Sequence, residues 1–250
     1  MHLIVETRQL LEVVEVEVAG RPLWVRREPR ARRWDLEVTR AILDCDEYLL
    51  EPLRTAGHVL RTVLDVGAHI GAFTLKVKSW WPEARVIAAE PDPDNAALFR
   101  RNTAGLEGVS LYGGAVLGRS GVTEVWLRQA GRANADGNAA ASSVTEVLAE
   151  LCPGAAPPTA VVAAIDVIDL LARHGDPEID LLKLDCEGAE GEILERLRAT
   201  GRMRGIGWIR GEWHFLPNLG RIAAALDGTH AFMIQRGEAP WGPFIAHRKP

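Results

Sequence analysis

The fold is decided by the stretch Thr62-Val63-Leu64-Asp65-Val66-Gly67-Ala68-His69-Ile70-Gly71-Ala72-Phe73-Thr74-Leu75. Its apolar run over residues 63–66 predicts a buried strand, and the apolar spacing from Phe73 onward predicts a helix. Between them, Gly67 and Gly71 bracket a tight turn in which small residues let the backbone approach a ligand closely. Strand, glycine loop and helix together form the opening unit of a doubly wound α/β domain, with free N–H groups at the helix start.

The glycine spacing narrows the class of ligand. A dinucleotide-binding loop reads G-x-G-x-x-G, whereas this loop reads G-x-x-x-G and has no second glycine for a pyrophosphate. Asp65 lies two residues before the first glycine, where a carboxylate repels a diphosphate and suits a cationic ligand. S-adenosylmethionine carries an ammonium and a sulfonium group and no phosphate, so it is the ligand we expect. An ordinary βα turn that binds nothing is the alternative.

A second acid lies at the end of the next predicted strand, over residues 85–89. Glu90 follows this strand directly and precedes Pro91. From Gly71 to Glu90 is 90 − 71 = 19 positions, which matches the offset of roughly 20 residues at which an acid binds ribose hydroxyls. We therefore expect Glu90 to accept hydrogen bonds from the ribose of an adenosine ligand; a glutamate that merely begins the next turn is the alternative.

The composition is that of an ordinary globular protein. With 250 residues, 47% of them hydrophobic and 25% charged, the chain suits one α/β domain with a modest extension. The net charge of −5 argues against a nucleic-acid partner. No apolar run approaches a membrane span and no signal peptide is present. Cys45, Cys152 and Cys186 lack metal-ligand spacing, so we expect free thiols in a reducing, cytoplasmic setting.

The first 55 residues are predicted to form an accessory unit ahead of a main α/β domain over residues 56–250. Alternating apolar residues over 12–27 predict a β-hairpin, and residues 35–50 are predicted to form a helix that closes over the site. Seven arginines between Arg21 and Arg40 make this unit locally basic. Such runs usually form a solvated face, and a docking patch for an acidic substrate or carrier is the alternative.

The rest of the chain alternates between predicted strands and helices. This alternation predicts a mostly parallel sheet covered by helices on both faces. The loop over 130–143 is rich in glycine, alanine and asparagine, and we expect it to be a lid over the site. The predicted strands are 109–116 (with Gly113-Gly114 inside it), an edge hairpin over 121–127, 160–165, 179–184, 206–213, 231–235 and 244–247; the predicted helices are 93–102, one capped by Asp166 that runs to Arg173, 189–197 and 218–226.

Three segments resemble the FkbM family of S-adenosylmethionine-dependent methyltransferases: residues 63–71, Glu90-Pro91 and Asp180-Leu181-Leu182-Lys183-Leu184-Asp185-Cys186-Glu187-Gly188-Ala189-Glu190. The last segment is the most specific of the three. The resemblance implies an α/β fold, namely a Rossmann-like seven-stranded class I methyltransferase sheet with one antiparallel strand near its edge. It also implies methyl transfer to a hydroxyl of a small molecule in secondary-metabolite or sugar biosynthesis, with S-adenosylhomocysteine as product. His69 stands where many members have asparagine.

Candidate site residues follow from these motifs and from the predicted strand ends. We expect the cofactor to contact Asp65, Gly67, Ala68, His69, Gly71, Phe73, Thr74, Glu90, Pro91, Asp92, Ala115, Val116 and Asp185. We expect the acceptor to contact Asn138, Ser142, Ser143 and Glu187. His214, at the end of the strand over 206–213, is the predicted catalytic base because a neutral imidazole can take a proton from a hydroxyl. Asp185 and Glu212 are the other candidates, and a purely structural His214 is the alternative.

No metal is expected at this site. Asp185 and Glu187 could be two of three acidic ligands, but no Asp-Asp pair follows them. Asp180, Glu190 and Glu192 are predicted to be surface or capping acids. Other activities stay open: an NAD(P)-dependent oxidoreductase, an RNA methyltransferase, and an inert module that binds an adenosine ligand. Homodimerisation also stays open, and the acceptor depends on variable loops.

Overall fold

The computed structural model describes residues 11–129, 142–145, 158–236 and 239–250. Its main sheet has seven strands in the order β12-β13-β11-β10-β3-β4-β5. All are parallel except β13, which runs antiparallel to both of its neighbours. The predicted seven-stranded sheet with one antiparallel strand near its edge is therefore confirmed. The strands are β3 (Thr62–Val66), β4 (Arg85–Ala89), β5 (Val109–Tyr112), β10 (Ile179–Leu184), β11 (Ile206–His214), β12 (His230–Ile234) and β13 (Trp241–Arg248).

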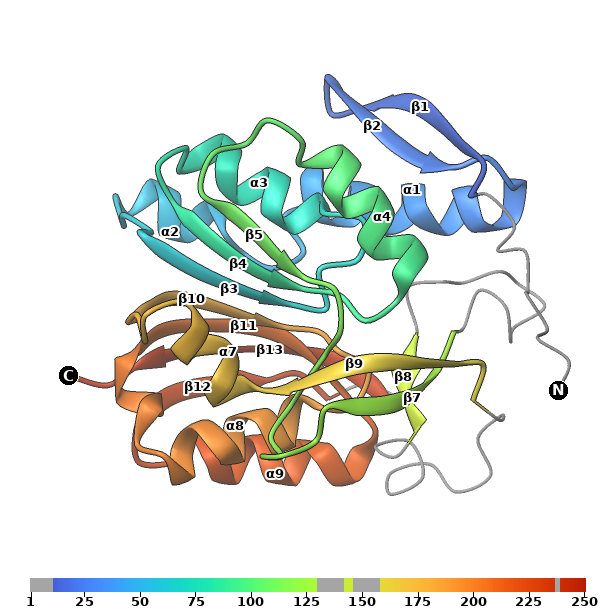
Figure 1. The fold of residues 1–250 in the computed structure, drawn as a ribbon. Helices are drawn as coiled ribbons and strands as arrows, with labels where there is room; N and C mark the ends of the chain where they lie inside the picture. Colours follow the sequence, from blue (N-terminus) through green and yellow to red (C-terminus); the bar gives the residue numbers. More distant parts are fainter. Residues whose placement is uncertain (1–10, 130–141, 146–157, 237–238) are drawn as a thin grey trace, which may run out of the picture.

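Helices cover both faces of this sheet because its central strands are apolar on both sides (Figure 1). Val63 and Leu181 pack into one buried cluster with side chains of α1, α2 and α3, whereas Leu64 and Leu182 pack into another with those of α7, α8 and α9. The helices are α1 (Pro29–Leu43), α2 (Glu51–Thr55), α3 (Ala72–Trp80), α4 (Pro93–Asn102), α7 (Val167–Arg173), α8 (Glu190–Ala199) and α9 (Leu216–Leu226). A 3-10 turn over Arg202–Gly205 leads into β11.

The N-terminal hairpin lies beside α1 and α4 (Figure 1), and its strands are β1 (Val13–Val18) and β2 (Arg21–Arg26). Leu23 and Val25 pack against residues of α3 and α4. The predicted helix over 35–50 is wrong at both ends, because α1 begins at Pro29 and ends at Leu43. Glu28 caps α1 by accepting a hydrogen bond from the Ala31 backbone at 2.7 Å, and proline is preorganised for the first helical position.

A second, four-stranded sheet lies beside the carboxyl ends of the main one, in the order β6-β9-β7-β8. The predicted single strand over 109–116 is wrong, because Gly113-Gly114 separates β5 from β6 and the two join different sheets. A Cβ on Gly114 would lie 2.6 Å from the Ala163 carbonyl oxygen, so only glycine fits here. The predicted edge hairpin over 121–127 is also wrong, since β7 pairs with β8 and β9. The strands are β6 (Ala115–Leu117), β7 (Glu124–Arg128), β8 (Ser143–Val144) and β9 (Ala160–Asp166).

Other predictions can be checked against the described residues. Asp166 caps α7, as predicted, by accepting a hydrogen bond from the Ile168 backbone. Cys45 and Cys186 are free, whereas Cys152 lies outside the described residues. Most of the predicted lid, residues 130–141, also lies outside them. Within the described ranges, no helix is long and apolar enough to cross a membrane.

Candidate active site

The glycine loop lies against the loop that follows β10. Gly67 and Ala68 each donate a backbone hydrogen bond of 3.0 Å to the Ala89 carbonyl oxygen at the end of β4. Gly67 has a φ of +80°, and a Cβ there would lie only 1.7 Å from the Asp185 carbonyl oxygen. Glycine is thus required because the backbone of a neighbouring strand end passes close by, in addition to any approach of a ligand.

Glu90 is held in place by the backbone around it. Its carboxylate accepts hydrogen bonds from the backbone nitrogens of His69 at 2.8 Å and Asp92 at 2.9 Å, and from the Asn95 side chain at 3.1 Å. It is 4% exposed, and burial together with the Asp92 charge raises its pKa. A carboxylate offers about four lone-pair sites. Three donors therefore leave Glu90 room for one further hydrogen bond from a ligand.

One cavity runs along the carboxyl ends of the central strands, and its empty volume, open mouth included, is about 1020 Å³. The structure brings most of the predicted site residues to its wall. These are Gly67, Ala68, His69, Phe73, Glu90, Pro91, Ala115, Val116, Ser142, Asp185, Glu187 and Glu212. Ligands of open α/β sheets bind at this edge, so the cavity is the candidate binding site.

The other predicted site residues lie elsewhere. Thr74 donates a 2.8 Å hydrogen bond to the fully buried Asp65, which ties α3 to β3 behind the cavity wall. Gly71 begins α3 with a φ of +99°, and Asp92 caps α4. Ser143 is buried in β8. Asn138 lies outside the described residues.

Lys183 is a buried cation under the glycine loop that sequence reasoning missed. Its Nζ atom lies 3.6 Å from Asp65 Oδ1 and 3.7 Å from Asp185 Oδ2, and it donates a hydrogen bond to the Gly67 carbonyl oxygen. Burial would lower its pKa, but the charges of Asp185 and Asp65 outweigh burial and raise it. The sequence contained a sign of this cation, because a lysine inside an otherwise apolar, buried strand requires a charged or hydrogen-bonding partner nearby.

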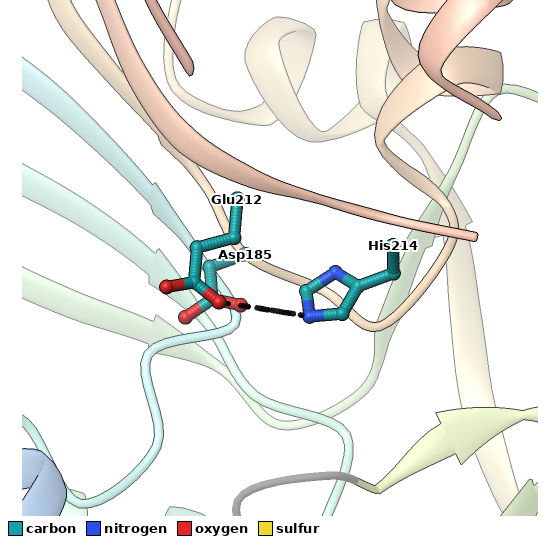
Figure 2. A group of neighbouring side chains, drawn as sticks. All are labelled: Asp185, Glu212 and His214. Carbon is teal, nitrogen blue, oxygen red and sulfur yellow. Dashed lines mark ion pairs between the residues drawn. The ribbon is translucent and has the colours of Figure 1, made fainter. Parts of the chain in front are cut away.

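A carboxylate–histidine cluster, consisting of Asp185, Glu212 and His214, lies at the ends of β10 and β11 (Figure 2). The His214 Nε2 atom is 3.8 Å from Asp185 Oδ1 and 3.8 Å from Glu212 Oε2. Its other ring nitrogen, Nδ1, is 2.9 Å from Glu190 Oε1. His214 is 7% exposed and lies outside the cavity wall, so the structure places the two carboxylates, and not the imidazole, against the cavity.

The cluster contains more negative than positive groups, and this raises the pKa values of its carboxyl groups. Burial and the Asp185 charge raise the pKa of Glu212 to about 8. Burial raises the pKa of Glu187 to about 7, with the charge of Asp185 adding to it and that of His214 opposing it. Burial would lower the pKa of His214, but Glu187 and Glu190 outweigh it and raise it well above the usual value. The cluster therefore favours an added positive charge.

Of the three acids predicted to be surface or capping acids, Glu190 and Glu192 are buried. Glu190 is fully buried, and its carboxylate accepts hydrogen bonds from the backbone nitrogens of Cys186 at 3.0 Å and Gly188 at 3.1 Å. Glu192 is 6% exposed and pairs with Arg119 at 2.7 Å. A surface position is wrong for both acids, because the loop after β10 folds back over the start of α8, which helical periodicity does not reveal. Glu190 nevertheless caps backbone groups, as the capping alternative predicted. Asp180 does act as a capping acid, for the backbone of residues 61–62.

The N-terminal unit contributes to the site. Val38 and Ile42 of α1 line the cavity. So does Tyr48, whose hydroxyl donates a 2.6 Å hydrogen bond to Asp185 Oδ2. Arg26, predicted as part of a solvated face, is instead 7% exposed and pairs with Asp35 of α1. Sequence reasoning missed Tyr48, because only folding brings the segment after α1 against β10.

Known proteins are similar to this chain in sequence or in structure. The chain is 29% identical over 215 residues to methyltransferase sdnD of Sordaria araneosa, which covers 72% of this chain and 77% of that protein. The crystal structure of precorrin-6y C5,15-methyltransferase from Geobacter metallireducens GS-15 is 15% identical with a TM-score of 0.46, over 86% of this chain and 88% of that one. A putative O-methyltransferase from Klebsiella pneumoniae is 16% identical with a TM-score of 0.46, over 89% and 91%.

The family comparison confirms the resemblance predicted from the sequence. The Methyltransferase FkbM domain matches residues 65–236, which are 236 − 65 + 1 = 172 of the 250 residues. The matched range includes the glycine loop, Glu90, and the whole carboxylate–histidine cluster. This chain therefore belongs to the FkbM family of methyltransferases.

Proposed function

We propose that this methyltransferase transfers a methyl group from S-adenosylmethionine to a hydroxyl oxygen of a small molecule. The observation that carries the proposal is a single cavity whose wall holds the glycine loop and Glu90 together with Asp185 and Glu212. The first pair of features suits a nucleoside ligand with a cationic end. The two carboxylates suit an oxygen that must lose a proton.

The cavity fits the cofactor. Glu90 keeps a free lone-pair site for a ribose hydroxyl, and the backbone at Gly67 and Ala68 lies at the cavity wall, where the amino-acid end would approach. Ala115 and Val116 offer apolar surface for the adenine. When bound, S-adenosylmethionine supplies a methyl group on a positively charged sulfur, a charge that the acidic wall favours.

The residues of the chain perform positioning and proton removal. Holding an oxygen in line with the methyl carbon supplies much of the rate enhancement of such a displacement. A hydroxyl also needs a proton acceptor within hydrogen-bonding reach. Because Asp185, Glu187 and Glu212 line the cavity and His214 lies behind the wall, we assign proton removal to a carboxylate and the support of the cluster to His214.

The negative charge of the cavity wall determines which charge the acceptor can carry. At pH values above about 8, where Glu187 and Glu212 are ionised together with Asp185, three carboxylates repel phosphorylated or carboxylated molecules. We therefore infer that the acceptor is a neutral or cationic small molecule with a hydroxyl group. This inference also disfavours RNA as the acceptor.

Calorimetric binding of S-adenosylhomocysteine tests the cofactor assignment. Replacing Glu90→Gln removes a charged acceptor, so affinity should fall by about 1.5–3 kcal/mol, or roughly 10- to 150-fold. Glu107→Gln, on the exposed loop before β5, is the matched control and should bind like the wild type. Equal affinities for all three proteins would contradict the assignment.

Methyl transfer is tested separately, with methyl-labelled cofactor and a panel of neutral hydroxylated acceptors. Label found only on nitrogen, carbon or RNA would exclude O-methylation.

A further inference from the structure

The carboxylate–histidine cluster has the composition of a metal site. Glu212 and His214 are two residues apart on β11 and therefore point to the same side of the sheet, while Asp185 comes from the end of the neighbouring strand. One ligand atom from each of the three lies within 4.8 Å of the other two (Figure 2). No metal was expected from the sequence because no Asp-Asp pair follows Asp185 and Glu187. Two carboxylates and an imidazole that come from two strands do not form a sequence motif.

The imidazole is oriented as a ligand would be. Glu190 accepts from backbone nitrogens and from Asn218, so it acts as an acceptor toward His214 Nδ1 as well. With one hydrogen on Nδ1, a cation that displaces the Nε2 proton would meet the Nε2 lone pair on the side of the cluster. Among the described residues Nε2 has no hydrogen-bond partner, because the nearest oxygens, on Asp185, Glu187 and Glu212, are 3.7–3.8 Å away. A carboxylate behind a histidine is the usual support of a metal-binding imidazole.

Asp185 is supported in the same way. Tyr48 donates its hydroxyl hydrogen to Oδ2 at 2.6 Å, and Lys183 lies 3.7 Å from that same oxygen. The other oxygen, Oδ1, faces His214 Nε2 at 3.8 Å. One oxygen of Asp185 is thus held by the protein, and the second is turned toward the cluster.

The separations leave room for an ion. A point equidistant from two atoms 3.8 Å apart can lie about 2.2 Å from both, which is a normal bond length for a divalent cation with oxygen and nitrogen ligands. At 3.7–3.8 Å the ligand atoms are too far apart to bond to each other directly. An ion of charge +2 would balance the two carboxylates that face it.

We propose that Asp185, Glu212 and His214 bind a divalent cation of the Mg²⁺ or Mn²⁺ class, and that the acceptor oxygen completes its coordination. Two carboxylate oxygens and one imidazole nitrogen suit such an ion. Three protein ligands leave open positions, as catalytic sites require. Binding of the cation stands independently of the reaction, whereas its role rests on the proposed methyl transfer.

In that role the cation acidifies the hydroxyl that it binds. The hydroxyl proton moves to Glu187, the cavity-lining carboxylate that the cation leaves free. The oxygen then forms its bond to the methyl carbon as the carbon–sulfur bond breaks, and the electron pair stays on sulfur. S-adenosylhomocysteine, the methyl ether and protonated Glu187 account for all atoms and charges.

Titration of the EDTA-treated full chain with MnCl₂, followed by calorimetry and by the electron paramagnetic resonance signal of free Mn²⁺, tests the site. We expect one Mn²⁺ per chain, and at least about a 10-fold loss of affinity in Glu212→Gln and in His214→Ala. Glu195→Gln, in the ion pair with Arg221, is the matched carboxylate control and should bind like the wild type.

Glu212→Gln is close to isosteric, so it decides the test if His214→Ala does not fold. A wild-type chain that binds no Mn²⁺ at millimolar concentration, or variants that bind it as tightly as the wild type, would overturn the proposal. Binding of S-adenosylhomocysteine to the metal-free chain is measured in parallel. Its absence would count against the proposed function and leave the Mn²⁺ result intact.

Discussion

Replacing Lys183 with methionine removes the cation that lies between two carboxylates beneath the glycine loop. Asp65 is fully buried, and its Oδ1 atom, 3.6 Å from Lys183 Nζ, has no hydrogen-bond partner among the described residues. At an effective dielectric constant of about 20, unit charges 3.6 Å apart attract by about 4.6 kcal/mol. Breaking a buried pair from one side leaves the other charge uncompensated. We therefore expect Lys183→Met to lower the free energy of unfolding by about 3–5 kcal/mol.

A double-mutant cycle isolates the pair. Asp65→Asn removes the charge and keeps an oxygen that can accept the Thr74 hydrogen bond. Lys183→Met leaves the buried Asp65 charge without its cation, whereas the double variant has no charge at Asp65, so the double variant should lose less than the sum of the single variants, with a coupling of about 2–3 kcal/mol. Urea-induced unfolding of the four proteins, followed by circular dichroism, measures this. The same cycle at the exposed pair Arg33–Glu37 should give less than about 1 kcal/mol.

Additivity within about 0.5 kcal/mol would refute the reasoning. In that case the Asp65–Lys183 contact would have no energetic weight. The contribution of Lys183 would then reduce to its contacts with Asp185 and the Gly67 carbonyl oxygen, which both Lys183→Met proteins lack equally.

Two further predictions concern the glycine loop and the N-terminal unit. Gly67→Ala places a Cβ 1.7 Å from the Asp185 carbonyl oxygen, whereas Gly20, with a similar φ of +71°, has no atom within 4 Å of such a Cβ. Thermal unfolding should show Gly67→Ala to be less stable than Gly20→Ala by at least about 2 kcal/mol, and equal losses would show that only the backbone angle matters. Asp35→Asn leaves Arg26 buried without its partner and should cost about 3–5 kcal/mol at neutral pH. Burial would raise the pKa of Asp35, but His69 and Arg26 outweigh it and hold the pKa below its ordinary value of 3.8. The stability from this carboxylate is therefore present above pH 3.8 and lost as pH falls through the lower folded pKa, so the two proteins should converge in acid; a difference independent of pH would contradict this.

Local patterns predicted most of the main sheet and its first site residues. The strand over 62–66, the glycine loop and the helix after it depend on apolar periodicity and on turn chemistry, which neighbouring residues decide. Glu90 could be predicted for the same reason, since its distance from Gly71 is fixed by one helix and one strand. The start of α1 could also have been predicted from neighbouring residues, because Glu28-Pro29 is a capping pair, but the prediction missed it.

The second sheet could not be predicted from local patterns. Its strands pair across long stretches of chain, as β7 does with β9, and short alternating segments carry no information about their partner. Gly113 and Gly114 were predicted to lie inside one strand. In the structure they let the chain pass from the main sheet to the second sheet, and no local pattern indicates this change.

The sequence by itself determined the class of fold, the family and the end of the cavity that holds the glycine loop and Glu90, because these depend on short motifs with defined spacing. Asp185, Glu212 and His214 were predicted as single candidates, but only the tertiary structure decided how they come together with Tyr48 and Lys183. These five residues come from three separate segments, and their distances are set by strand register and by the packing of the loop after α1. The burial that raises the pKa of Glu212 to about 8 likewise belongs to the folded protein, because a charge is costly only where its surroundings exclude water.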